Sequence, residues 1–179
     1  SVVRSYIQHQ LGKQNKSHKF YYLGSSYRRE RPQKGRFRQF RQFGLEAFGS
    51  SLPEQDAEII YMSYSLYSSL GIKNLELKIN SIGNRESRKK YKKALQAYFI
   101  KFKDQLTKTS QKRLNNNPLR ILDTKIDFEI NLIKNAPKII DYLDKEDKEH
   151  FNQVLEFLDN MKLPYIVDYY LVRGLDYYS

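Results

Sequence analysis

The chain has 179 residues, 40% of them hydrophobic, and a formal net charge of +12. This length and composition allow one hydrophobic core and a small second one, and they exclude a disordered chain. The absence of cysteine excludes disulfides and thiolate metal sites, and no apolar run reaches the roughly 18 residues of a membrane span.

Three histidines, His9, His18 and His150, have no metal-ligand spacing, so no metal site is predicted. Nothing resembles a signal peptide either, and we expect a cytoplasmic protein. The chain opens without methionine and stops in the middle of a pattern, which predicts an internal piece of a longer protein.

The positive charge is concentrated at the start of the chain, where residues 1–41 hold eleven basic side chains and one acidic. A basic field attracts polyanions, which favours nucleic acid or a nucleotide as partner. The alternative is a lysine-rich proteome, which explains a general excess of charge but not a local one.

The first predicted elements are a helix over 2–11 and two strands over 20–29 and 38–48 that form a hairpin. Seven of the fourteen residues from Arg28 to Arg41 are basic. Guanidinium groups pair bidentately with phosphate oxygens and stay charged. Lys34, Arg36 and Arg38 are therefore predicted to lie in or beside a mobile loop at a phosphate site.

Strand alternation gives the hairpin two different faces, because successive side chains point to opposite sides. One face is predicted to be a core face of Leu23, Tyr27, Phe43 and Leu45. The other combines small residues with a few polar groups and one ring, the composition of a ligand floor rather than of an ordinary solvent-facing sheet surface: Gly24, Ser26, Gly44, Arg28, Gln42, Glu46 and Phe40.

Beyond the hairpin, the pattern predicts a helix from Pro53 to near Gly71, a strand over 74–80, helices over 85–161 and a strand over 165–173. A small helical module is thus set into a sheet domain, with boundaries at 1–83, 84–163 and 164–179. The mixed, net-basic surface of this module fits either a solvated face or an RNA contact.

Two long segments resemble one known family. YRRERPQKGRFRQFRQFGLEAFG, residues 27–49, resembles the second signature motif of class II aminoacyl-tRNA synthetases in its histidine-specific form, and LVRGLDYY, residues 171–178, resembles the histidine-specific motif. Shorter segments that look like the family follow in the expected order: VVRSYIQHQL, DAEII, LKINSIG and NPLRILD. The resemblance implies an α+β fold, a mainly antiparallel sheet with an inserted α-helical subdomain.

The resemblance also implies that the parent protein activates histidine with ATP, with Mg²⁺ expected beside the ATP, and transfers it to tRNA(His) as a cytoplasmic homodimer. Arg28 and Arg173 would then be catalytic at the α-phosphate. ATP would be bound by Arg28, by Glu30 at the adenine, by Arg36 at the distal phosphates and by Phe40 through stacking. Histidine would be bound by Gln42, Glu46, Tyr177 and Tyr178.

The family's first and third motifs have no counterpart in this sequence, so we expect the isolated chain to be inactive. Two other interpretations stay open. One is a non-catalytic paralogue of the synthetase, such as the regulatory subunit of histidine biosynthesis. The other is an RNA-binding fragment that grips a tRNA acceptor stem without catalysis.

Overall fold

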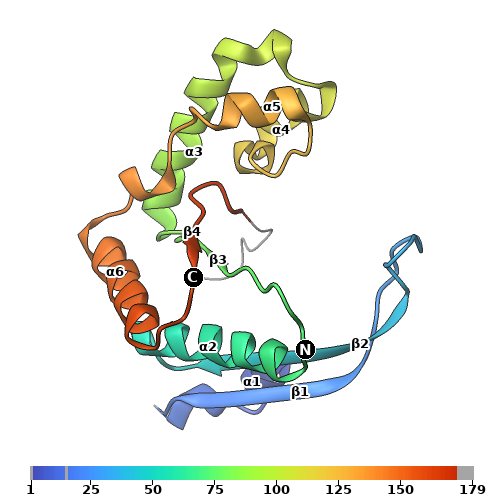
Figure 1. The fold of residues 1–179 in the computed structure, drawn as a ribbon, viewed down its shortest axis with the longest axis vertical. Helices are drawn as coiled ribbons and strands as arrows, with labels where there is room; N and C mark the ends of the chain where they lie inside the picture. The colour runs from blue at the N-terminus through green and yellow to red at the C-terminus, as the bar shows by residue number, and fades with distance from the viewer. Residues whose placement is uncertain (1, 15, 173–179) are drawn as a thin grey trace. The chain divides into compact units, whose positions relative to one another are not determined.

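The computed structural model describes residues 2–14 and 16–172, and the chain divides into two compact units, Ser1–Ile59 and Ile60–Ser179 (Figure 1). Three predicted site residues, Arg173, Tyr177 and Tyr178, lie outside the described residues. Within the described part of the chain, no helix is long and apolar enough to cross a membrane.

The first unit is built on the predicted hairpin. Helix α1 (Val2–Gln8) and a 3-10 turn, η1 (Leu11–Gln14), precede strands β1 (His18–Tyr27) and β2 (Gln39–Phe48), which pair antiparallel over their whole length. The predicted helix over 2–11 is shorter than expected because Gln10 takes a positive φ of 51°, which interrupts the helical backbone.

Helix α2 (Pro53–Ser69) confirms the helix that was predicted from Pro53 to near Gly71. Pro53 is compatible with the first helical turn, where its missing N–H costs nothing, and Glu54 and Asp56 lie near the positive end of the helix dipole. Gly71, with φ of 76°, follows the end of the helix in the left-handed conformation that glycine adopts most easily.

The second unit is mostly helical. Its elements are β3 (Lys78–Ile79), α3 (Arg85–Phe99), η2 (Ile100–Gln105), α4 (Lys108–Asn116), η3 (Pro118–Ile121), α5 (Asp127–Ile133), η4 (Ile139–Asp141), α6 (Lys145–Asn160) and β4 (Ile166–Val167). The predicted helical region over 85–161 is confirmed.

The two strands predicted at 74–80 and 165–173 are much shorter in the structure and pair parallel, Lys78 with Ile166 and Ile79 with Val167. The alternating pattern of a strand predicts which side chains share a face, but the strand's backbone hydrogen bonds also require a neighbouring strand. Among the described residues, the sheets are therefore one antiparallel pair and one short parallel pair, and the chain is a mixed helix and strand protein.

The hydrophobic core lies in the second unit. On α3, Tyr91, Leu95 and Phe99 recur every four residues, which places them on one face of the helix, and all three are buried. They pack with residues from the other helices and turns: Leu106, Leu114, Ile121, Leu122, Ile133, Ala136, Ile139 and Leu143. Burial of each such large side chain contributes about 1.5–3 kcal/mol to folding.

A buried carboxylate joins three segments of this helical region. Glu129 of α5 is fully buried, and its Oε1 accepts hydrogen bonds from the Thr107 amide and hydroxyl, both at 2.9 Å. Its Oε2 accepts from Ser110 Oγ at 3.0 Å and Thr124 Oγ1 at 2.6 Å. Burial raises the pKa of Glu129, but these hydrogen bonds outweigh burial and hold the pKa below its usual value.

The predicted core face of the hairpin is not buried. Tyr27 is 74% exposed and Leu23 67% exposed, while Phe43 is 42% exposed and Leu45 is half-buried. On this face, Lys19 of β1 forms an ion pair with Glu58 of α2. Alternation correctly identified an apolar face, but it did not reveal how much of that face this chain covers.

Candidate functional site

The strand register gathers the predicted ligand floor on one face of the hairpin. Ser26 lies opposite Phe40, Gly24 opposite Gln42, and Phe20 opposite Glu46. Along β1 the side chains of this face are half-buried while those of the other face are exposed. The structure therefore brings the groups of this face together as the alternation predicted.

Arg28 lies at the end of this face, directly beyond β1. Its amide donates to the Arg38 carbonyl at 2.8 Å, which extends the hairpin pairing by one position. Its guanidinium carbon lies 3.9 Å from the centre of the Phe40 ring, a cation–π contact. Arg28 Nε is buried and has no hydrogen-bond partner among the described residues, so the guanidinium retains donors for an anion.

Tyr22 lies on this face but was not predicted to be a site residue. Its hydroxyl accepts a hydrogen bond from Gln42 Nε2 at 3.0 Å. Its ring crosses Gly44, where a Cβ would lie 2.1 Å from the Tyr22 Cζ. Gly44 was expected to leave room for a ligand, but that room is filled by Tyr22, whereas a Cβ at Gly24 would meet nothing within 4 Å. An aromatic residue cross-strand from a glycine was the signal that could have identified this arrangement.

Glu46 lies toward the other end of the face, beside an aromatic cluster. Tyr6 of α1 stacks on Phe48 with ring centres 4.4 Å apart, and it meets Phe20 and His18 edge-on. Glu46 is half-buried, and no hydrogen bond or ion pair of its carboxylate is found within residues 2–14 and 16–172. A carboxylate next to rings suits a cationic or hydrogen-bond-donating ligand group.

The basic connection between the strands ends in a tight turn. Gln33 and Arg36 exchange both backbone hydrogen bonds, at 3.2 and 2.8 Å, and Gly35 supplies a positive φ of 75°. Arg36 Nη1 donates to Glu30 Oε2 at 2.9 Å. The two residues predicted to contact opposite ends of ATP thus pair with each other. An exposed pair of this kind is worth about 0–1 kcal/mol, which a phosphate ligand can outcompete.

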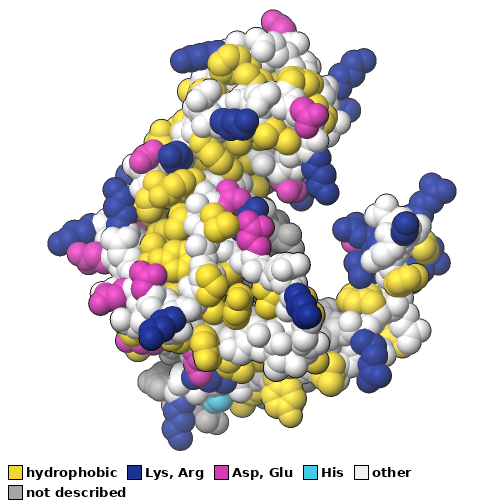
Figure 2. All heavy atoms as spheres, in the orientation of Figure 1, with side chains coloured by type: hydrophobic (Ala, Val, Ile, Leu, Met, Phe, Trp, Pro, Cys, Tyr) yellow, Lys and Arg dark blue, Asp and Glu magenta, His cyan; other side chains and the backbone are white. Residues whose placement is uncertain are grey.

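Lys and Arg side chains gather at the loop end of the hairpin (Figure 2). The electrostatic field of these side chains favours negatively charged ligands near this end of the hairpin. The half-buried guanidinium of Arg28, which lies over the Phe40 ring, adds a further positive charge. Gln42 and Glu46 supply an amide and a carboxylate farther along the same face. Taken together, the face can bind an anionic group, a planar ring and an amino or imidazole N–H group.

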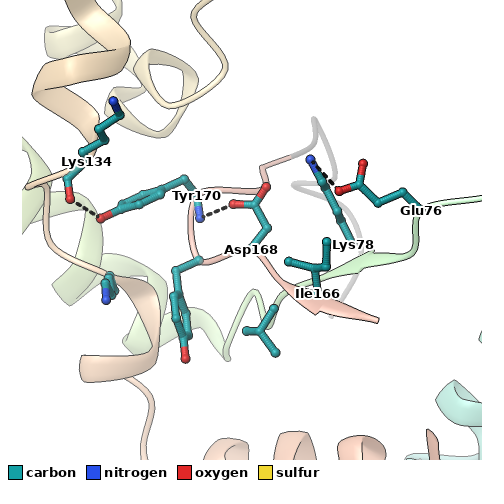
Figure 3. Close-up of a pocket in the computed structure, with 9 residues that line it drawn as sticks. Glu76, Lys78, Lys134, Ile166, Asp168 and Tyr170 are labelled. Carbon is teal, nitrogen blue, oxygen red and sulfur yellow. Dashed lines mark hydrogen bonds and ion pairs between the residues drawn. The ribbon is translucent and has the colours of Figure 1, made fainter. Parts of the chain in front are cut away.

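A separate depression of about 390 Å³ lies in the second unit, between β4 and the connection that follows α5 (Figure 3). It contains none of the predicted site residues and is lined by Glu76, Lys78, Lys134, Lys138, Ile166, Val167, Asp168, Tyr169 and Tyr170. Across the described residues, no group of three or more His, Asp or Glu side chains comes together in a way that could hold a metal ion.

The whole chain, residues 1–179, matches the family model described as histidyl-tRNA synthetase. It is 49% identical over 180 residues to a histidine--tRNA ligase from Streptococcus mutans and 51% identical over 178 residues to one from Acholeplasma laidlawii. Each alignment covers 99% of this chain and 42% of the relative.

A solved structure is also similar. The crystal structure of apo S. aureus histidyl-tRNA synthetase superposes with a TM-score of 0.74 at 41% sequence identity, covering 99% of this chain and 41% of that one. The chain therefore spans about two fifths of the length of the proteins it resembles.

Proposed function

The chain belongs to the histidyl-tRNA synthetase family, and from that premise we propose that it forms part of the catalytic domain of a histidine--tRNA ligase. The observation that supports this most directly is the gathering of Arg28, Phe40, Gln42 and Glu46 on one face of the β1–β2 hairpin or at its end. A phosphate, an adenine ring and a histidine are ligands that these four groups suit chemically.

The proposal also divides the chain into regions. Residues 1–83 form part of the catalytic core of the class II synthetase type, residues 84–163 form a helical insertion, and residues 164–179 return to the catalytic core. The buried core of α3 to α5 supports the insertion as a cooperative body, because its side chains pack on one another rather than on a sheet.

Each site residue has a proposed role. Arg28 holds the α-phosphate and the activated carboxylate, Phe40 stacks on adenine, and Glu30 lies at the adenine. Arg36 meets the distal phosphates. Gln42 and Glu46 bind the amino group or side chain of histidine, with Tyr22 orienting the Gln42 amide. Arg173 acts at the α-phosphate, and Tyr177 and Tyr178 line the histidine pocket, as the family resemblance assigns them.

These roles suit the first reaction of a ligase. A histidine carboxylate oxygen forms a bond to the α-phosphorus of ATP while the bond to pyrophosphate breaks, giving histidyl-adenylate. Two anions approach and charge builds on the phosphoryl oxygens, so a preorganised guanidinium stabilises the transition state more than the ground state. The second reaction transfers the histidyl group to the 3′ end of tRNA(His) and releases AMP.

Mg²⁺ accompanies ATP in reactions of this class, where it neutralises charge on the distal phosphates. The described residues contain no group of three or more His, Asp or Glu side chains that could hold a metal ion. The proposed partners are histidine and tRNA(His), and the proposed assembly of the complete ligase is a homodimer.

The test is histidine-dependent exchange of pyrophosphate into ATP, with the complete ligase that carries this segment. We expect exchange with histidine and none when histidine is omitted. Histidine binding without exchange would instead support a non-catalytic paralogue. Binding of tRNA that falls steeply with salt and ignores ATP and histidine, again without exchange, would support an RNA-binding protein. The 179-residue chain alone is expected to be inactive, and robust exchange by it would contradict that expectation.

A further inference from the structure

The two residues of β2 that are proposed to bind histidine, Gln42 and Glu46, lie on either side of a glycine. That glycine, Gly44, is paired with Tyr22 of β1, so the tyrosine comes from the register position midway between them. Side chains placed diagonally across an antiparallel pair are within reach of an aromatic residue. A Cβ at Gly44 would lie 2.1 Å from Tyr22 Cζ. The ring therefore occupies space that only a glycine leaves open.

One hydrogen bond determines how the Gln42 amide is turned. Gln42 is exposed, so packing does not hold its amide, but Gln42 Nε2 donates to the Tyr22 hydroxyl at 3.0 Å. An amide group has donors on its nitrogen and acceptor positions on its oxygen. With the nitrogen turned to the tyrosine, the oxygen Oε1 is the other end, and no side chain or amide among the described residues donates to it. Tyr22 thus selects the end of the amide that stays available.

The available groups on this part of the face are then both acceptors. An ionised carboxylate has only acceptor positions, and that of Glu46 has no partner within the described residues. Gln42 Oε1 is the second acceptor. A ligand that supplies an ammonium or an imidazole N–H satisfies them, whereas a ligand without such a donor leaves an acceptor unpaired. Sites built to hydrogen-bond a ligand N–H discriminate strongly for that reason.

We propose that Tyr22 is a specificity-determining residue of the histidine site: by binding the Gln42 amide nitrogen it leaves Gln42 Oε1, together with the Glu46 carboxylate, to select a ligand that carries N–H donors. This inference rests on the proposed function. Tyr22 acts through Gln42 and is therefore a positioning residue, and Gly44 is required because the Tyr22 ring crosses it. The donor that Gln42 recognises is either the ammonium or the imidazole N–H of histidine.

The decisive variant is Tyr22→Phe in the complete ligase, which removes the hydroxyl and keeps the ring over Gly44. We expect KM for histidine in pyrophosphate exchange to rise about fivefold, while kcat and KM for ATP change by less than about twofold. Tyr21→Phe is the matched control. Tyr21 is on the opposite face of β1, is 76% exposed, and its hydroxyl has no hydrogen bond among the described residues. It should leave all three constants unchanged.

Two histidine analogues, used as inhibitors of exchange, show which donor is recognised. Imidazolepropionate lacks the ammonium, and a ring-N-methylated histidine lacks the imidazole N–H. Tyr22→Phe should weaken histidine and one analogue by the same factor, about fivefold, and leave the other unchanged, because the recognised donor is already missing from it. An unchanged imidazolepropionate identifies the ammonium, and an unchanged methylated histidine identifies the ring N–H. Equal weakening of all three ligands would overturn the inference, since it indicates a general disturbance of the site.

A double-mutant cycle tests whether Tyr22 acts through Gln42. Adding Tyr22→Phe to Gln42→Ala should raise KM for histidine almost no further, whereas independent effects would multiply. Melting temperatures of all variants are measured in parallel, and the assays are run well below them. The inference is also overturned if Tyr22→Phe retains the unmodified KM for histidine, if both tyrosine variants raise it equally, or if the effects multiply. Absence of exchange in the unmodified ligase would instead refute the proposed function.

Discussion

Glu46 on the hairpin and Glu129 in the helical region are both glutamates removed from full contact with water, but they are satisfied in different ways. Glu129 accepts four hydrogen bonds from Thr107, Ser110 and Thr124, all within the second unit. Glu46 has no hydrogen bond or ion pair within the residues that the structure describes. A carboxylate satisfied by its own fold maintains that fold, whereas one left without a partner is available to a ligand.

The same contrast holds for the two units as wholes. The second unit contains nearly all of the buried hydrophobic residues found in the described chain, and its helical core supplies most of its stability. The hairpin of the first unit has no buried side chain along either strand, and it carries the Arg28 guanidinium with an unpartnered Nε. Substitutions in the hairpin should therefore change activity with little effect on folding, and substitutions in the helical core should do the reverse.

The largest expected effect is on catalysis by Arg28→Ala in the complete ligase. Loss of one preorganised donor to a developing phosphoryl charge lowers kcat for exchange by about 10²–10³-fold. Arg29→Ala is the matched control, since Arg29 is the adjacent, exposed arginine and contributes the same charge to the field. Equal losses in the two variants would mean that the general field, rather than the Arg28 contact, is what matters.

Glu129→Ala should have the largest effect on folding. The substitution leaves four donors of Thr107, Ser110 and Thr124 without their acceptor, and we expect a loss of about 3 kcal/mol in the free energy of unfolding. Urea unfolding of the 179-residue chain, followed by circular dichroism at 222 nm, reports mainly the helices. Glu46→Ala is the comparison, and it should unfold within about 0.5 kcal/mol of the unmodified chain.

Glu46→Gln should reduce kcat/KM for histidine about 10–100-fold, because a charge-assisted hydrogen bond to the ligand is worth about 1.5–3 kcal/mol. The variant retains the shape of the side chain and is expected to unfold normally. If histidine kinetics are unchanged while stability falls, Glu46 would be a structural carboxylate like Glu129, and the contrast between the two units would be broken.

The smallest expected effect is a pH dependence of stability. The pKa of Glu129 lies below its value of 4.5 in the unfolded chain, so as pH falls the unfolded state binds the proton first. The stability that this carboxylate contributes is fully present above pH 4.5 and is lost as pH falls through the lower, folded pKa. Unfolding curves of the unmodified chain between pH 6 and pH 3 should show that loss, and Glu129→Gln should have a smaller one.

The sequence was sufficient for features that depend on local pattern. Pro53 and Gly71 marked the limits of α2 to within two residues. Alternation placed Phe40, Gln42 and Glu46 on the same face because pairing in a hairpin preserves the side of each residue. The roles of these residues remain predictions.

Features that depend on distant partners could not be predicted. The Tyr170 hydroxyl meets carbonyls 34 and 36 residues away, and no period in the sequence records such a contact. The strand predicted over 165–173 was shortened to Ile166–Val167 because its pattern specified a face but not a neighbouring strand. Gly44 was expected to leave space for a ligand, because the prediction did not use the strand register that places Tyr22 opposite Gly44.

The parallel pairing of β3 with β4 has a consequence for the topology of the chain. Two parallel neighbours cannot be joined by a tight turn, so the chain must cross back over the sheet before it re-enters, and a crossover of a dozen or more residues is sufficient. Here 86 residues separate Ile79 from Ile166. One helix would meet the geometric requirement. The remaining helices between β3 and β4 are therefore not needed to connect these two strands.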